Sequence, residues 1–297
     1  MKKTAFIAIV GRPNVGKSRL LNALTGEKIA IVSNKPQTTR NRVTGILTRG
    51  EDQFVFMDTP GLHKPKTKLG QYMVKTVKST IGDVDAAFLV TEPTGRVGRA
   101  EEAIMQQLKT YEIPTILVIN KTDIHNGKEI GDTILAYSAV FDFAAVVPLS
   151  AMKEKNIDAL LDEAKQFLYE GDWMFGEDDV TDQPERKIAA EMIREKILRT
   201  CNEEIPHGVA VDIEDFKETE KLLSVRATVY CERESHKTIL IGHNGEKLKQ
   251  IGTYAREDME RFFDKKVYLN LWVKVKSNWR DSQASLHDFG FDPDDLQ

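Results

Sequence analysis

The chain has 297 residues, of which 41% are hydrophobic and 30% are charged, and its formal net charge is −4. This composition predicts a soluble protein of about two domains, and the net charge does not indicate a nucleic-acid partner, so such a partner has to be argued from local features. We expect neither a membrane span, which needs roughly 20 consecutive apolar residues, nor a signal peptide. The two cysteines, Cys201 and Cys231, are expected to be reduced thiols of a cytoplasmic protein.

The first half of the chain alternates apolar and helical segments. The apolar segments are rich in Val, Ile, Leu and Phe, which is typical of parallel strands buried on both faces. They predict strands at 5–10, 54–57, 86–90, 115–119 and 146–149. The alternation predicts an α/β domain over residues 1–170, with a mostly parallel sheet, helices on both faces and a last helix at 156–169. Residues 171–183 are expected to be a linker, with its Trp, Met and Phe side chains against a domain surface.

The second half has a different pattern, which predicts an α+β domain over residues 184–280. Its elements are expected in the order α-β-β-α-turn-α-β. They cover a helix at 185–201, strands at 208–213 and 223–231, a short apolar stretch at 238–241, a turn at 242–245, a second amphipathic helix and a strand at 267–275. The acidic tail, residues 281–297, is expected to be loosely held.

Residues 11–18 read G-R-P-N-V-G-K-S and match the phosphate-binding loop GxxxxGK[ST]. They follow a predicted strand and precede a helical segment, which is the context that the motif requires. Backbone N–H groups of the loop and the helix N-terminus attract phosphate oxygens. Lys17 is expected to reach the β- and γ-phosphates, and Ser18 to ligate Mg²⁺. The other loop residues predicted to bind nucleotide are Gly11, Asn14, Val15 and Gly16.

Further residues are expected beside the phosphates. Asp58, at the end of a predicted strand, can hold Mg²⁺ through a water, and Gly61 can offer its backbone N–H to the γ-phosphate. Between the first helix and the next strand, Thr39 is expected to close on Mg²⁺ and the γ-phosphate, with Thr38 as the alternative. The predicted catalytic residues are therefore Lys17, Asn14, Thr39 and Gly61, and the predicted metal ligands are Ser18, Thr39 and Asp58.

Two segments at strand ends predict recognition of guanine. The Asp123 carboxylate of Asn-Lys-Thr-Asp can accept hydrogen bonds from two guanine donors that adenine lacks, so GTP is favoured over ATP. Asn120 is expected to brace this loop, and the Lys121 stem to cover the base. In the tripeptide Ser150, Ala151 and Met152, the Ala backbone N–H is expected to meet the guanine oxygen.

The turn at 242–245 predicts an RNA site in the second half. A GxxG turn lets the backbone approach about four nucleotides, with an apolar residue such as Ile241 beneath the bases. Acidic residues slightly outnumber basic ones in this half, so the charge argument rests on nearby lysines. The residues predicted to contact RNA are Ile241, Gly242, His243, Asn244, Gly245, Lys247, Lys249, Lys274 and Lys276, with Trp272 and Trp279 beside the last strand.

Taken together, the motifs at 11–18, 37–40, 58–63 and 120–123, followed by the α-β-β-α-GxxG-α-β order, resemble the Era family of bacterial GTPases with a type II KH domain. The resemblance covers essentially the whole chain. It implies a GTPase that binds GTP, GDP and Mg²⁺, binds small-subunit (16S) ribosomal RNA, and assists assembly of the small ribosomal subunit. It also implies a monomer in the cytoplasm with some association at the membrane surface. Arg19 and the pair His243-Asn244 depart from the family pattern, and the latter weakens the charge argument for RNA.

The resemblance also bears on hydrolysis. Leu62 stands where many GTPases carry the Gln that orients the attacking water, which predicts slow basal hydrolysis. Together with Asn14, this is similar to potassium-activated GTPases, in which K⁺ occupies the position of an arginine finger. Nucleotide state is expected to reach the second domain or the RNA through residues 59–69, by way of Lys64, Lys66 and Lys68.

Two alternatives remain open from the sequence. The first is a signalling GTPase whose second domain binds a protein or a membrane lipid instead of RNA. The second is a non-enzymatic RNA adaptor in which nucleotide serves only to stabilise the fold. Binding to ribosomal RNA separates the first alternative from the leading interpretation, and multiple-turnover release of phosphate separates the second.

Overall fold

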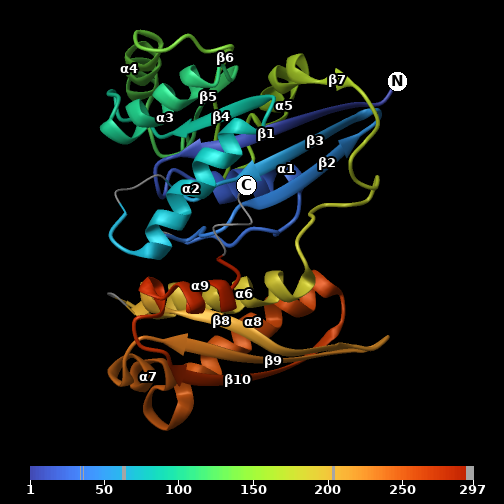
Figure 1. Ribbon diagram of the computed structural model, residues 1–297. Helices are drawn as coiled ribbons and strands as arrows, with labels where there is room; N and C mark the ends of the chain where they lie inside the picture. The colour runs from blue at the N-terminus through green and yellow to red at the C-terminus, as the bar shows by residue number, and fades with distance from the viewer. Residues whose placement is uncertain (34, 36, 62–64, 203–204, 292–297) are drawn as a thin grey trace.

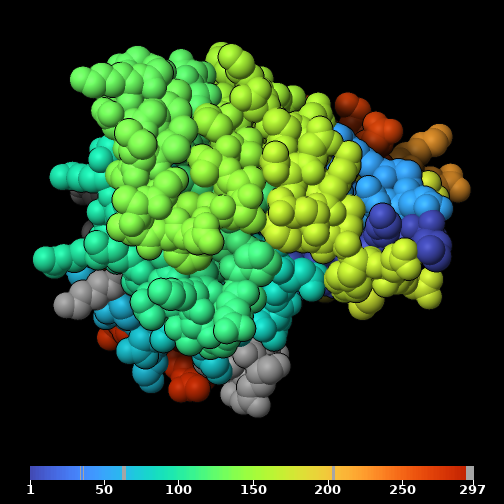
Figure 2. Space-filling model, turned by 90° about the horizontal axis from the view of Figure 1, so that it is seen from above, coloured from blue at the N-terminus to red at the C-terminus, as the bar shows by residue number. Residues whose placement is uncertain are grey.

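Two separate β-sheets, one in each half of the chain, organise the structure (Figure 1). The computed structural model describes residues 1–33, 35, 37–61, 65–202 and 205–291. In Figure 1 the N-terminal half lies above the C-terminal half, and a single extended segment connects them along one side. Seen from above in Figure 2, the N-terminal half covers most of the C-terminal half, so the two are stacked and not laid end to end.

The N-terminal sheet has the strand order β2-β3-β1-β4-β5-β6. Its strands are β1 (Lys3–Gly11), β2 (Val43–Arg49), β3 (Asp52–Asp58), β4 (Ala86–Thr91), β5 (Thr115–Ile119) and β6 (Ala145–Pro148), and the short β7 (Tyr169–Glu170) pairs with the start of β1. All pairs along this order are parallel except β2 with β3. The predicted parallel sheet is therefore confirmed. The sequence prediction missed β2, an edge strand whose mixture of Thr, Gly and Arg lacks a continuous apolar run.

Helices cover both faces of this sheet, and β1 shows why its strands are apolar throughout. Ile7 and Ile9 contribute to one buried cluster with α1 (Lys17–Thr25) and α5 (Ile157–Ala164). Ala8 and Val10, pointing the other way, contribute to a second cluster on the opposite face. The helices there are α2 (Lys68–Gly82), α3 (Arg99–Thr110) and α4 (Gly127–Ser138). The last predicted helix is shorter than expected, since a 3₁₀ turn at Lys165–Phe167 replaces its end.

The connecting segment, residues 171–183, lies along the edge of the N-terminal sheet. The Trp173 indole N–H donates to the Glu51 carbonyl at 3.0 Å, and the backbone N–H groups of Met174 and Phe175 donate to the buried Gln53 side chain. Farther along, the Ile46 N–H donates to the Val180 carbonyl at 2.9 Å. These bonds run along the edge strand β2 and the start of β3. They hold the segment against the domain surface as predicted, although the Met174 side chain itself is 64% exposed.

The C-terminal sheet has the order β10-β9-β8, with β9 and β10 parallel and β8 and β9 antiparallel. Its elements are α6 (Glu185–Thr200), β8 (Ala210–Glu218), β9 (Leu222–Cys231), α7 (Glu234–Ile241), α8 (Glu246–Phe263) and β10 (Lys266–Val275). Alternate residues of β9, such as Val225 and Val229, pack with Ile193 and Ile197 of α6 and with Ile251 of α8. The opposite face of the sheet carries exposed side chains, among them Trp272 of β10. The observed order matches the predicted one.

The tail is not loosely held over its described part, so that expectation is wrong. Residues 283–288 form α9 (Gln283–Asp288), and Leu286 and Phe291 pack with Trp279 against α2 of the N-terminal half. Trp279, which the sequence places beside the last strand, is fully buried and donates from its indole N–H to the Gly208 carbonyl at 2.9 Å. Acidic residues separate these apolar residues in the sequence, so their common burial was not predicted. Within the described ranges, no helix combines the length and apolar character that crossing a bilayer requires.

Candidate nucleotide site and RNA interface

The phosphate-binding loop needs its glycines for space as well as for conformation. Gly11 has a φ of +152°, and a Cβ there would lie 2.4 Å from the Val90 carbonyl oxygen. Gly16 caps α1 at a φ of +101°, and a Cβ there would lie 2.2 Å from the Asn120 amide nitrogen. Asn14 also has a positive φ, of 66°. The backbone of residues 11–16 therefore curves tightly over the N-terminus of α1, where anions are favoured.

Lys17 is buried at the base of this loop. Its ammonium donates to the Gly11 carbonyl at 3.2 Å and to the Arg12 carbonyl at 2.9 Å. Burial lowers the pKa of Lys17 to about 8, an effect that the nearby Asp58 carboxylate opposes. A phosphate in the loop would favour the charged ammonium in the same way as Asp58 does, so the residue is suited to hold an anion.

The three predicted metal ligands meet in one cluster. The Ser18 hydroxyl lies 2.7 Å from the Thr39 hydroxyl and donates to the Asp58 carboxylate at 2.6 Å, and Thr39 donates to the same carboxylate oxygen at 3.2 Å. The other carboxylate oxygen of Asp58 is buried and has no hydrogen-bond partner. Burial raises the pKa of Asp58 to about 6, although the Lys17 ammonium and the two hydroxyls act to lower it.

This cluster fits Mg²⁺ by its chemistry. Two hydroxyls and a carboxylate are hard oxygen donors, and an uncompensated buried carboxylate oxygen is stabilised by a cation. Within the described residues, no group of three or more His, Cys, Asp or Glu side chains could hold a metal by itself. A magnesium ion here would therefore depend on phosphate oxygens of a nucleotide for much of its coordination.

The structure describes some, but not all, of the other residues predicted at the phosphate end of the pocket. Gly61 lies against the loop, where a Cβ would sit 2.6 Å from the Pro13 nitrogen. Thr38 turns away, since its hydroxyl donates to the Lys35 carbonyl at 2.6 Å, so Thr39 alone of the two threonines reaches the cluster. Leu62 and Lys64 lie outside the described residues.

Asn120 links the two ends of the pocket. Its side-chain amide donates to the Val15 carbonyl at 2.8 Å, and its oxygen accepts the Ala151 backbone N–H at 3.0 Å. The first bond agrees with a bracing role. The second occupies the Ala151 N–H in this structure, so its predicted contact with the guanine oxygen stays a prediction.

Asp123 lies at the base end of the pocket, where its carboxylate accepts the Ser150 hydroxyl at 2.6 Å. This hydrogen bond lowers the pKa of Asp123, which keeps it ionised as an acceptor. Lys121 has a φ of 65°, and its ammonium pairs with Glu92 at 2.9 Å, which leaves its stem along the pocket. The exposed Met152 side chain adds apolar surface beside it.

These residues enclose one pocket with a volume of about 270 Å³. Its wall includes residues that the sequence prediction missed, namely Arg19, Ile31, Val32, Ser33, Gln37 and Ile124. Most of them belong to the segment that follows α1. The apolar run at 29–31, which the structure leaves outside any strand, is the signal in the sequence that pointed to a buried loop there.

In the C-terminal half, the predicted turn has the required geometry. Gly242 has a φ of +74°, and a Cβ there would lie 2.6 Å from that of Lys247, while Gly245 caps α8 at a φ of +81°. His243 and Asn244 are exposed at its tip. A groove of about 370 Å³ begins at Gly245 and follows α8 and β10. It is lined by Leu248, Lys249, Gly252, Thr253, Arg256, Leu269 and Leu271, several of which the sequence prediction missed.

Two of the predicted RNA-binding lysines lie elsewhere. Lys274 alternates with Val273 and Val275, which face the helices, so it projects from the opposite face of the sheet and pairs with Glu214 at 3.2 Å. Lys276 pairs with Asp288 at 2.8 Å and lies over the Phe289 ring. The two lysines therefore lie on the outward face and at the end of the last strand, as the sequence predicted, and their contact with RNA stays a prediction. Ile241 and Lys247 are half-buried beside the turn, whereas Lys249 is exposed.

Two family models match the chain. One, described as a 50S ribosome-binding GTPase, matches residues 6–121, and the other, a KH domain, matches residues 204–280. GTPase Era of Clostridium kluyveri is 50% identical over 98% of this chain and 100% of its own length. GTPase Era of Ruminiclostridium cellulolyticum is 49% identical over 97% of each chain. The chain belongs to the Era family of GTPases.

Solved Era structures agree with this assignment over the whole chain. A variant of Aquifex aeolicus Era bound to GDP and AlF₄⁻ is 38% identical, with a TM-score of 0.93 and coverage of 98% of this chain and 99% of that one. Era in complex with MgGDPNP and nucleotides 1506–1542 of 16S ribosomal RNA is 37% identical, with the same TM-score and coverage of 98% and 100%. The predicted fold class, a P-loop GTPase domain followed by a KH domain, is confirmed.

The buried Asp58 carboxylate generates a prediction about stability. Its pKa is raised from 3.8 to about 6, so protonation favours the folded state; this stabilisation is complete below pH 3.8 and is lost as the pH rises through 6. In nucleotide-free protein, Asp58→Asn should therefore raise the free energy of unfolding by about 2 kcal/mol at pH 7.5 and by about half as much at pH 5.

The measurement is urea unfolding of both proteins at the two pH values. Asp212→Asn, a change at an exposed carboxylate, serves as the control and should have little effect at either pH. An Asp58→Asn effect of equal size at pH 5 and pH 7.5 would contradict the assigned burial cost.

Proposed function

We propose that this Era-family GTPase is a molecular switch that binds 16S ribosomal RNA through its KH domain and assists assembly of the small ribosomal subunit. The observation that carries the proposal is the presence, in one chain, of a complete nucleotide pocket and a GxxG turn that opens into a groove. The solved Era that holds a 16S segment is similar to this chain along its entire length. The family model described as a 50S ribosome-binding GTPase matches only the nucleotide-binding half of the chain, so it does not decide which RNA is bound.

The groove suits single-stranded RNA by its composition. Leu269 and Leu271 give it an apolar floor for bases, while Lys249 and Arg256 supply cations for phosphates. The positive φ values at Gly242 and Gly245 let the protein backbone approach the RNA backbone closely. Phosphate contacts would set the register of the strand, and contacts with base edges in the groove would select the sequence. The proposed RNA-binding residues are thus those of the turn with Lys247 and Lys249, extended by Arg256, Leu269 and Leu271.

In the nucleotide site, each side chain is assigned a role that fits its position. Lys17 and the loop N–H groups hold the phosphates, Asp123 accepts hydrogen bonds from guanine, and Ser18, Thr39 and Asp58 hold Mg²⁺. When bound, Mg²⁺ supplies positive charge against the β- and γ-phosphates. Lys17 and Gly61 place N–H donors on the γ-phosphate side of the same pocket, where charge changes during hydrolysis.

We further propose slow basal hydrolysis that K⁺ stimulates, with Asn14 as a ligand of the cation. Asn14 lines the phosphate end of the pocket and has a positive φ. Of the two cationic side chains of residues 11–18, Lys17 is held at the base of the loop and Arg12 pairs with Glu101, so neither is assigned as an arginine finger. Contact with a membrane surface and the monomeric state remain predictions of the family resemblance.

The potassium hypothesis predicts that hydrolysis at saturating GTP and Mg²⁺ is about tenfold faster in KCl than in NaCl, a modest part of the roughly 10³–10⁵ that an arginine finger provides. Asn14→Gly should abolish the difference while leaving GDP affinity nearly unchanged. Glycine is chosen because it removes the amide without straining a residue at positive φ. Phosphate release under multiple turnover is the measurement, and equal rates of the unchanged protein in both salts would refute the hypothesis.

The RNA hypothesis predicts that the double substitution of His243→Asp and Asn244→Asp lowers affinity for a 16S 3′-end oligonucleotide at least about tenfold, because carboxylates would face phosphates. Affinity for GTP should not change. Lys249→Ala should weaken RNA binding and reduce its salt dependence, and it should do so more than the matched substitution Lys274→Ala on the opposite face of the sheet.

The measurement is fluorescence anisotropy with the labelled oligonucleotide over a range of salt concentrations. Absence of RNA binding in both nucleotide states would favour a signalling GTPase with a protein or lipid partner. RNA binding without multiple-turnover hydrolysis would favour the adaptor alternative.

A further inference from the structure

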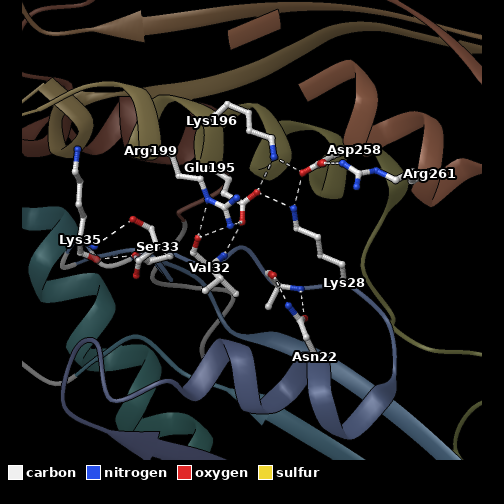
Figure 3. A network of polar contacts seen from close by, with 12 residues as sticks. Asn22, Lys28, Val32, Ser33, Lys35, Glu195, Lys196, Arg199, Asp258 and Arg261 are labelled. Atoms are coloured by element: carbon white, nitrogen blue, oxygen red, sulfur yellow. Dashed lines mark hydrogen bonds and ion pairs between the residues drawn. The ribbon is translucent and has the colours of Figure 1, made fainter. Parts of the chain in front are cut away.

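One segment of the N-terminal domain contacts the nucleotide pocket and the C-terminal domain at once. We define the switch segment as residues 27–40, of which 34 and 36 are outside the described ranges. Ile31, Val32, Ser33, Thr38 and Thr39 line the nucleotide pocket. On its other side the segment meets α6 and α8 of the KH domain through the network of polar contacts drawn in Figure 3.

The first half of the switch segment is held by buried charges. The Lys28 ammonium pairs with Glu195 at 2.8 Å and with Asp258, both of the KH domain. The Glu195 carboxylate is fully buried and also accepts the Val32 backbone N–H at 2.9 Å. Arg199 donates to the Val32 carbonyl at 3.1 Å. Figure 3 shows these side chains converging on one point between the domains.

The second half of the segment is held on both sides of Thr39. The Arg194 guanidinium of α6 donates to the Thr38 carbonyl and is oriented by Glu191. The Arg40 guanidinium donates to the Val209 carbonyl at 2.6 Å and to the His207 carbonyl at 2.9 Å, and lies 5.6 Å from the centre of the Trp279 ring. Both guanidinium groups are buried, with side chains 2% and 3% exposed.

Thr39 is therefore placed by the KH domain. Its neighbours on each side are fixed to α6 and to the segment before β8, and successive Cα atoms are only 3.8 Å apart. The Thr39 hydroxyl meets Ser18 and Asp58 between these two attachments, so both attachments restrict the backbone that carries it. A shift of about 1 Å in a group of the catalytic site can lower a rate by as much as roughly 10²-fold.

We propose that Arg194 and Arg40 are positioning residues for GTP hydrolysis, which act by holding Thr39 at the magnesium site. The inference rests on the proposed role of Thr39 as a magnesium ligand. It makes the KH domain a structural part of the GTPase site and not an appended binding module. Both cations are removed from water at the interface, and the cost of burying them opposes docking of the domains. Docking is thus an arrangement that a ligand of either domain can shift.

The test is a double-mutant cycle in the full-length protein. Arg194→Met and Arg40→Met should each lower kcat about tenfold and raise the Mg²⁺ concentration for half-maximal hydrolysis about fivefold. GDP affinity should change less than about twofold, because GDP has no γ-phosphate to order the switch segment. Arg186→Met is the matched control, since Arg186 lies on the same helix but donates to Ile213 within the KH domain, and it should leave all three values unchanged.

The decisive step is to repeat both substitutions in a Thr39→Ala background. If the arginines act through Thr39, they should have no further effect there, whereas a loss of general stability would lower the rate equally in both backgrounds. Arg194→Lys and Arg40→Lys, which keep the charge and fold more safely, should restore part of the Mg²⁺ response.

The possible failures are distinguishable. If Thr39→Ala alone leaves Mg²⁺-dependent hydrolysis unchanged, the proposed magnesium role of Thr39 is wrong, and the positioning inference falls with it. If Thr39→Ala impairs hydrolysis while both Met variants match Arg186→Met, or while their effects persist in the Thr39→Ala background, the positioning inference alone is overturned.

Discussion

The arrangement of the two domains depends on the ion pair and hydrogen bonds that the buried Glu195 carboxylate makes across the interface. A charge removed from water must be paired, and Glu195 finds its partners in Lys28 and the Val32 N–H of the other domain. Breaking the domains apart would expose it to water again and free the switch segment. The same contact therefore fixes the KH domain against the GTPase domain and fixes one wall of the nucleotide pocket.

This shared wall has a thermodynamic consequence. A ligand that binds the docked and undocked arrangements unequally must shift the population of Thr39 at the magnesium site, and a nucleotide that orders Thr39 must shift docking by the same free energy. The interface combines the Lys28–Glu195 ion pair and the Arg194–Thr38 hydrogen bond with an apolar cluster around Trp279. Such a mixed interface suits reversible docking better than a wholly apolar one.

The segment that makes most contacts between the nucleotide pocket and the KH domain also differs from the segment that the sequence predicted. Residues 59–69 do reach the C-terminal half, since the Lys68 backbone N–H donates to Asp281 at 3.0 Å and Leu69 packs near Trp279. The more extensive polar contacts come from the switch segment. The family match supports a GTPase, and this geometry gives a physical reason for joining a GTPase to a KH domain in one chain.

Local chemistry could be predicted from the sequence, and long-range pairing could not. The loop at 11–18, Asp58 and Asn120 are recognisable because a strand end, a glycine and a short spacing fix their geometry. Arg194 and Glu195 carry no such signal, because their partners lie more than 150 positions away. The burial of Trp279 depends on the fold of the tail, whose apolar residues are separated by acidic ones. The outward position of Lys274 could be predicted, since the two-residue period of its strand places it opposite Val273.

The most direct test measures whether RNA binding to the KH domain and nucleotide binding to the GTPase domain are coupled. The affinity of a 16S 3′-end oligonucleotide is determined for the full-length protein bound to GDP and to a non-hydrolysable GTP analogue, and the affinities of both nucleotides are determined with and without saturating RNA. The account predicts that RNA affinity differs at least about fivefold between the two nucleotide states, and that RNA changes the ratio of nucleotide affinities by the same factor. Equal RNA affinities in the two states would contradict it.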